Sequence, residues 1–199
     1  MRTHFCKTLM TGAAIGLIAA SGLSAQTTGS TATSSAASGI DVAITYSTAR
    51  SNAVGGSSFW MQGGGVQGHG LVYRGLGVVG DLSALHNGNV QSSGVGLDLV
   101  TVTFGPRYTW QAAHAHYSLF GQALVGIAGG FHSDFPTYYG VVPTEKSLAF
   151  KAGGGFNIAL SSHVSLRAIE ADWLRTQFSN STNSSQSNLQ LNTGFVFRF

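Results

Sequence analysis

The last eleven residues of the chain, Leu189 to Phe199 (LQLNTGFVFRF), alternate between two kinds of side chain. In an extended strand, one face carries Leu189, Leu191, Thr193, Phe195, Phe197 and Phe199. The other face carries Gln190, Asn192, Gly194, Val196 and Arg198. A soluble protein seldom leaves such an aromatic face and its strand edge in water, because both promote aggregation. The pattern therefore favours a strand that lies in lipid.

The first 25 residues have the pattern of a secretory signal peptide. A basic start contains Arg2 and Lys7, an apolar run covers 9–20, and small residues precede a cleavage site after Ala25. No later window offers roughly 18 uninterrupted apolar residues, the length that a spanning helix needs. We therefore expect export through the Sec pathway and cleavage near Ala25. The mature protein is then either soluble outside the cytoplasm or crosses a membrane as strands.

The composition of the expected mature chain excludes several classes of protein. Once Arg2 and Lys7 leave with the signal, eight Lys and Arg remain against seven Asp and Glu, so we expect no nucleic-acid partner. The only cysteine, Cys6, also lies in the signal, and disulfides are not expected. The 28 glycines and the low charge content favour a kinked, strand-rich chain over a helical one.

The rest of the chain divides into a lead-in and one domain. Residues 26–38 (QTTGSTATSSAAS) are interpreted as a flexible periplasmic lead-in. Residues 39–199 contain alternating segments close to the length of about 9 to 11 residues that a tilted strand needs to cross the hydrocarbon. The expected strands are 39–49, 58–68, 75–86, 97–110, 116–128, 147–159, 164–178 and 188–199. The expected fold is all-β, an eight-stranded antiparallel transmembrane β-barrel after a cleaved signal peptide.

The expected connections alternate in length. Short ones join the fourth strand to the fifth around His114 and the sixth to the seventh at 161–163. Longer polar ones lie at 51–57, 87–96, 129–146 and 179–187. Bacterial outer-membrane barrels show this alternation, with turns in the periplasm and loops outside the cell. We therefore expect a Gram-negative cell outer membrane as the location.

The hairpin of the sixth and seventh strands suggests a register. With a two-residue turn at 161–162, Lys151 lies opposite Asp172, and Phe150 lies opposite Trp173 on the apolar face. Charges and aromatic residues thus favour the same pairing.

Charged residues on these strands are expected to point into the barrel, because an ionised side chain that faces acyl chains is costly. The predicted interior network is Asp81, Arg107, Lys151, Glu170 and Asp172. An eight-stranded barrel is just wide enough for side chains to fill, so the network would close the interior rather than line an open pore. The alternative is that some of these charges, Asp81 above all, lie at strand ends in water. Aromatic residues expected in belts at the headgroup level are Tyr108, Trp110, Tyr138, Tyr139 and Trp173.

These features resemble the small outer-membrane β-barrel proteins of OmpA/OmpX type. The resemblance covers 39–199 and rests on the signal peptide, the eight strands and three segments: FGPRY (104–108), RAIEADW (167–173) and FVFRF (195–199). It implies an interior salt-bridge cluster, and it implies that the barrel-assembly machinery reads the terminal aromatic residues Phe195, Phe197 and Phe199 as an assembly signal. The peptidoglycan-binding domain of longer members is not expected here.

The favoured function is non-enzymatic: an envelope-structural or surface-interaction role, with a porin-like pore of low conductance as a close variant. A lipid-modifying barrel enzyme is the first alternative, because His163 and Ser165 share a strand face, as a nucleophile and its base would. An adhesin that acts through the loop 129–146 is the second. The expected partners are outer-membrane lipids and the assembly machinery, and the protein is expected to be a monomer.

No cofactor or metal is expected. His114 and His116 have a spacing that could chelate a metal from one strand face, but no third ligand is near in the sequence. The glycine runs at 63–65 and 153–155 are not followed by a helix or by Lys-Ser/Thr, so they do not form a phosphate loop. We interpret them as sites of sharp strand curvature.

Overall fold

The structure is a computed structural model that describes residues 39–54, 57–88, 96–111, 115–137, 140–178 and 185–199. The expected signal peptide (1–25) and lead-in (26–38) lie outside the described residues.

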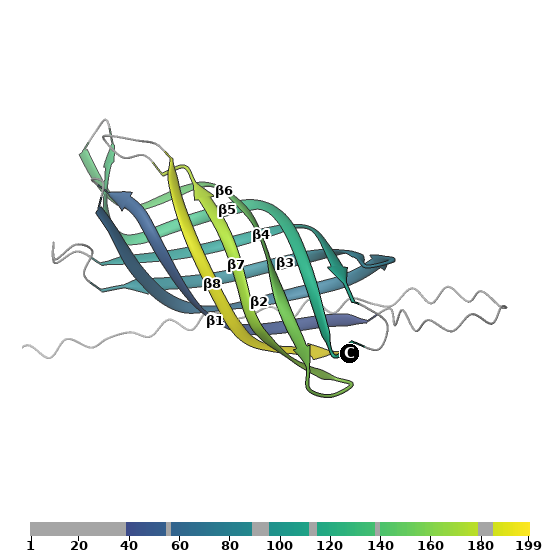
Figure 1. The fold of residues 1–199 in the computed structure, drawn as a ribbon. Helices are drawn as coiled ribbons and strands as arrows, with labels where there is room; N and C mark the ends of the chain where they lie inside the picture. The colour runs from purple at the N-terminus through teal and green to yellow at the C-terminus, as the bar shows by residue number, and fades with distance from the viewer. Residues whose placement is uncertain (1–38, 55–56, 89–95, 112–114, 138–139, 179–184) are drawn as a thin grey trace, which may run out of the picture. The chain divides into compact units, whose positions relative to one another are not determined.

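Eight antiparallel strands form one closed barrel, in which each strand pairs with its neighbours in the sequence (Figure 1). The strands are β1 (Ile40–Val54), β2 (Ser57–Tyr73), β3 (Leu76–Asn87), β4 (Leu97–Trp110), β5 (Tyr117–Thr137), β6 (Gly140–Ala159), β7 (Val164–Thr176) and β8 (Gln186–Arg198). The final strand closes the barrel on β1, with Ile44 opposite Phe195. The predicted all-β class, with eight antiparallel strands in a closed barrel, is confirmed.

The strands bury their polar side chains and expose their apolar ones. In β4, Thr101 and Thr103 are buried, whereas Val102 and Phe104 between and beyond them are exposed. The aromatic face of β8 also points outward, and Phe195 is 49% exposed. This inverted alternation is the pattern of a barrel that faces hydrocarbon. Separately, the described part of the chain has no helix long and apolar enough to cross a membrane.

One end of the interior is nevertheless apolar. A cluster of buried residues lies inside the barrel toward the β1–β2, β3–β4, β5–β6 and β7–β8 connections: Ala49, Phe59, Met61, Leu85, Leu97, Leu99, Ala128, Ala149, Leu174 and Phe178. Alternation did not predict this layer, because apolar strand positions were expected on the outer face. Polar and charged side chains occupy the interior between this cluster and the opposite end, which carries the β2–β3, β4–β5 and β6–β7 connections.

Two of the expected long loops are largely strand. The β1–β2 pairing continues to Val54 opposite Ser57. The expected loop 129–146 is an extension of β5 and β6, whose pairing continues to Thr137 opposite Gly140 (Figure 1). At the other end of the barrel, Arg74 and Gly75 form a tight turn with positive φ angles of 40° and 87°.

The β6–β7 register differs from the expected one by two residues. Gly153, and not Lys151, lies opposite Asp172, and Ala152 lies opposite Trp173. The turn contributes one residue of this shift: Ala159 lies opposite Ser165, and the amides of Leu160 and Ser161 both donate to the Val164 carbonyl. An irregularity between Phe156 and Asn157 adds the second residue. Beyond it the total shift is even, so Glu170 and Asp172 keep the interior face.

A β-bulge in β7 reverses its alternation. The pairing of β7 with β8 shifts between Arg167 and Glu170, and its pairing with β6 shifts between Phe156 and Asn157. As a result, Arg167 and Glu170 both point into the barrel, although they are three residues apart.

Inward glycines let neighbouring strands approach closely. We therefore expect a glycine-to-alanine substitution to lower stability at some glycine positions and not at others. A Cβ at Gly126 would lie 1.9 Å from the Val102 carbonyl oxygen, whereas a Cβ at the outward-facing Gly80 would meet nothing within 4 Å. We expect Gly126→Ala to destabilise the barrel by about 1–3 kcal/mol, because the strands must move apart. Urea unfolding in detergent micelles measures the effect, with Gly80→Ala as the control. Equal midpoints for the two variants would refute the packing argument.

Candidate functional site: the charged interior

Six charged side chains meet inside the barrel. The exposed fractions are 5% for Asp81, 3% for Arg107, 0% for Lys151, 1% for Arg167, 0% for Glu170 and 0% for Asp172. Five of them are the predicted network, and the structure brings all five together. The sixth, Arg167, balances the formal charge at three cations against three carboxylates.

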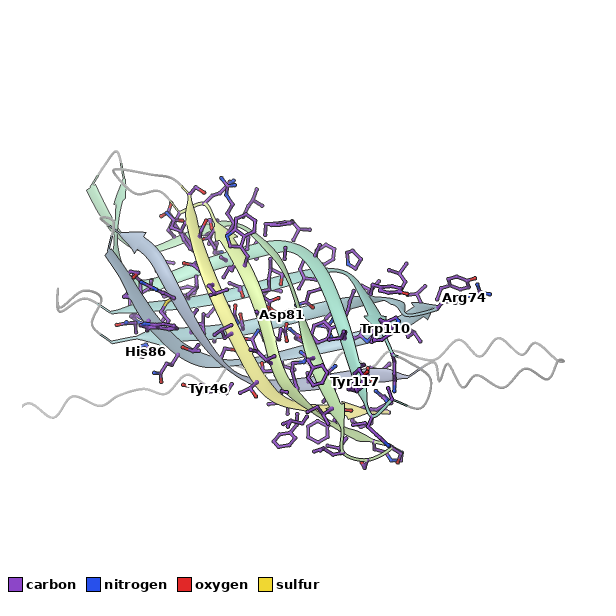
Figure 2. All side chains as sticks on the ribbon, in the orientation of Figure 1. Tyr46, Arg74, Asp81, His86, Trp110 and Tyr117 are labelled. Atoms are coloured by element: carbon purple, nitrogen blue, oxygen red, sulfur yellow. The ribbon has the colours of Figure 1, made fainter. Side chains whose placement is uncertain are left out.

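Lys151 and Asp81 form an ion pair across the barrel. The Lys151 Nζ lies 2.5 Å from the Asp81 Oδ1, so the pair joins β6 to β3, which are not neighbours in the sheet. The sequence-based register had placed Lys151 against Asp172 instead. Asp81 lies near mid-barrel in the side-chain view (Figure 2), and its second oxygen accepts a hydrogen bond from Gln67 at 2.9 Å.

Two glutamines link charges that do not touch. The Gln67 Nε2 donates to Asp81 and to the Glu170 Oε1 at 2.8 Å, and its Oε1 accepts from Arg107 at 2.6 Å. Gln122 accepts from Arg107 and donates to Glu170 at 2.7 Å and to Asp172 at 3.0 Å. Arg107 therefore reaches the carboxylates through amides. Sequence reasoning missed both glutamines because it searched for charges only, although both occupy inward positions of their strands.

Arg167 completes the network from the bulged strand. Its Nη1 donates to the Glu170 Oε2 at 2.6 Å and to the Gln67 Oε1 at 2.5 Å. The predicted network did not include Arg167, and strict alternation from Glu170 and Asp172 would place it on the outer face. The bulge between them corrects that assignment.

The glycine run of β6 makes room for the network. A Cβ at Gly153 would lie 2.3 Å from the Asp172 Oδ1, and a Cβ at Gly155 would lie 2.6 Å from the Phe120 ring. The Arg107 and Arg167 guanidinium carbons lie 4.3 and 4.7 Å from the centre of that same ring. The glycines thus have a packing role in addition to any effect on curvature.

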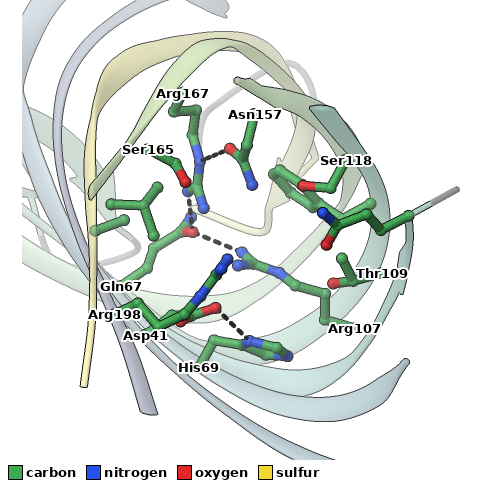
Figure 3. A pocket seen from close by; sticks show the side chains of 14 residues that line it. Asp41, Gln67, His69, Arg107, Thr109, Ser118, Asn157, Ser165, Arg167 and Arg198 are labelled. Atoms are coloured by element: carbon green, nitrogen blue, oxygen red, sulfur yellow. Dashed lines mark hydrogen bonds and ion pairs between the residues drawn. The ribbon is translucent and has the colours of Figure 1, made fainter. Parts of the chain in front are cut away.

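Beside the network, toward the end of the barrel with the β2–β3, β4–β5 and β6–β7 connections, lies a cavity of about 30 Å³ (Figure 3). Arg107 and Arg167 form part of its wall. Asp41 also lines it and is held by His69 at 3.5 Å and Arg198 at 3.3 Å.

The other predicted residues lie outside this network. Tyr108, Trp110 and Trp173 are between 43% and 54% exposed on the outer face, whereas Tyr138 and Tyr139 fall outside the described residues. Of the terminal aromatics, Phe197 is half-buried and Phe199 is 78% exposed.

The candidate catalytic pair is not assembled among the described residues. The His163 imidazole is exposed and hydrogen-bonds to Ser162, whereas Ser165 is buried inside the barrel. The candidate metal ligand His114 lies outside the described residues, and its partner His116 is exposed.

A histidine cluster that the sequence did not suggest lies at the opposite end of the barrel. His86 and His132 each contact one oxygen of Asp98, the latter at 2.6 Å. No group of three His, Cys, Asp or Glu in the described ranges is arranged to hold a metal ion.

The Lys151–Asp81 pair predicts strong coupling between two substitutions. Lys151→Met leaves a carboxylate buried without its cation, so we expect a loss of about 3–5 kcal/mol in unfolding free energy. Adding Asp81→Asn should recover part of that loss, with a coupling energy of about 0.5–3 kcal/mol. A double-mutant cycle by urea unfolding in micelles measures both values.

The control for this cycle is Arg175→Met, because Arg175 is exposed and hydrogen-bonds only to Ser185 among the contacts described. We expect it to change stability by less than about 0.5 kcal/mol. If Lys151→Met cost no more than this control, the interior pair would have no structural importance.

No protein-family model matches the chain, and no curated protein matches its sequence. Solved structures do share its fold. Neisserial surface protein A aligns with a TM-score of 0.62 at 12% identity, over 80% of this chain and 97% of that one. Ail, the attachment invasion locus protein of Yersinia pestis, aligns with a TM-score of 0.53 at 16% identity, over 81% of this chain and 99% of Ail. Ail in complex with the heparin analogue sucrose octasulfate aligns with a TM-score of 0.54 at 16% identity, over 81% and 98% of the two chains. By its fold, this chain is a small, closed eight-stranded antiparallel β-barrel like those of Neisserial surface protein A and Ail.

Proposed function

We propose that this protein is a non-enzymatic, integral outer-membrane barrel whose interior is closed by its own side chains and which acts as a structural element of the cell envelope. The main support for a closed interior is that hydrogen bonds and ion pairs of the network cross the interior between strands that are not neighbours. Gln67 on β2 bonds to Glu170 on β7, and Lys151 on β6 pairs with Asp81 on β3. Such contacts occupy the path that ions would follow.

The apolar cluster supports the same proposal from the other end of the barrel. Phe59, Met61 and Leu99 are buried inside, beyond the charged layer. An ion that entered from that end would have to leave water before it reached a charged group, which is costly.

A closed interior predicts very low ion conductance. In planar lipid bilayers we expect the wild-type protein to give no steady large current, in contrast to a 16-stranded porin inserted under identical conditions. Small, brief openings would fit the low-conductance variant. A sustained conductance on the scale of the porin control would contradict a closed interior.

The non-enzymatic assignment is supported by the surroundings of His163 and Ser165: the imidazole is exposed and hydrogen-bonds to Ser162, whereas Ser165 is buried inside the barrel. Mass spectrometry of lipid A from expressing and deletion strains tests it directly. Identical acylation patterns are expected, and an acyl chain lost or gained with expression would favour the enzyme instead.

A surface-attachment role is a second candidate, favoured by the β5–β6 extension. These two strands have 21 and 20 residues. They continue as a paired ribbon beyond the start of β4 and the end of β7 (Figure 1). The fold is shared with Ail, which is described as an attachment invasion protein and has been crystallised with a heparin analogue.

Shortening the ribbon tests this second role. Residues 133–144 are replaced by a short Gly/Ser turn, and cells that express the wild-type or shortened protein are applied to heparin-coated and uncoated surfaces. Attachment through the ribbon predicts a loss of heparin-dependent adhesion at equal surface expression. Unchanged adhesion would leave the structural role as the remaining proposal.

A further inference from the structure

The cavity beside the charge network has a strongly cationic wall. Arg107 and Arg167 line it from β4 and β7, and both guanidinium groups are directed toward its middle (Figure 3). The carboxylates that balance them, Asp81, Glu170 and Asp172, do not line the cavity. Among the described residues that line the cavity, the one carboxylate is that of Asp41, which is already shared between His69 and Arg198.

Each of the two arginines has an unused terminal nitrogen. Arg107 donates through Nε and Nη2, and Arg167 donates through Nε and Nη1. Neither the Arg107 Nη1 nor the Arg167 Nη2 donates to any residue within the described ranges. A guanidinium offers five N–H donors. Both side chains are at least nine-tenths buried and both line the cavity, so an acceptor for these two nitrogens has to lie within it.

The acceptor that the two guanidinium groups share is neutral. The Gln67 Oε1 accepts from the Arg107 Nη2 at 2.6 Å and from the Arg167 Nη1 at 2.5 Å. An amide oxygen satisfies donors but supplies no negative charge. Two like charges that face the same ring, Phe120, therefore lack an anion on the cavity side.

We propose that this cavity binds a small inorganic monovalent anion, of the size of chloride, bromide or nitrate, between Arg107 and Arg167. The volume of about 30 Å³ sets the size limit. It corresponds to about two water-sized positions, because each needs roughly 10–15 Å³. A larger organic anion such as gluconate does not fit. The bound anion accepts from the two unused nitrogens and supplies a negative charge on the cavity side of the two guanidinium groups.

A comparison of salts tests the site in the full-length, folded protein in detergent micelles. Unfolding midpoints are measured as sodium bromide, chloride or nitrate replaces sodium gluconate at constant ionic strength, so that screening stays the same. A ligand that binds only the folded state raises the midpoint. We expect a rise with each small anion that saturates as the site fills. Midpoints that do not distinguish chloride from gluconate would overturn the proposal.

A matched pair of substitutions locates the effect. Ser165 lines the cavity and precedes Arg167 on the same inward face of β7. In Ser165→Asp, the new carboxylate takes the place of the anion, and we expect the salt dependence to disappear. Ser165→Asn has the same size without the charge and should retain the dependence. A Ser165→Asp protein that responds to bromide as the wild type does would place the anion elsewhere and refute the site.

Diffraction from wild-type crystals grown in sodium bromide gives an answer that requires no variant. The anomalous signal of bromine should appear between the Arg107 Nη1 and the Arg167 Nη2. Bromide bound elsewhere, with this cavity holding water alone, would refute the assignment.

Discussion

The interior of this protein is organised by one constraint: a charged side chain that points into a narrow barrel must find its partners there. Three cations and three carboxylates meet at mid-barrel, and two glutamines extend the reach of charges that do not touch. The glycines of β6 follow from the same constraint, because side chains at 153 and 155 would occupy the space of Asp172 and Phe120. The interior is thus layered, with an apolar cluster, a charged layer and a small cationic cavity in sequence along the barrel.

Much of this interior arrangement could be predicted from the sequence, because successive side chains of a strand point to opposite faces. Alternation, together with the cost of placing a charge against acyl chains, assigned Asp81, Arg107, Lys151, Glu170 and Asp172 to the interior. Beyond the bulge the β6–β7 register was wrong by two residues, and because an even shift keeps each side chain on its face, Glu170 and Asp172 still point inward. The number of strands followed from segment length, which a barrel of this type restricts.

What could not be predicted depends on contacts remote in sequence or on a broken period. The bulge before Glu170 reverses the alternation within RAIEADW, and no residue type in that segment marks where the extra residue lies. For that reason, Arg167 was not predicted to belong to the interior network. The inward Phe59 and Met61 have the same chemistry as outward residues, so composition cannot separate them. The ribbon of β5 and β6 replaced an expected loop because backbone pairing continues regardless of the polar sequence.

The central claim, that the interior charges are paired away from water, is tested most directly by side-chain hydrogen exchange in the wild-type protein. NMR in lipid nanodiscs compares the Arg107 and Arg167 Nε protons with those of the exposed Arg50 and Arg175. The Arg107 Nε bond to Gln122 is buried and the Arg167 Nε bond to Asn157 is part-buried, so both interior protons should exchange far more slowly than the exposed ones. If all four exchanged at the rate of the exposed side chains, water would reach the network freely and the account would be contradicted.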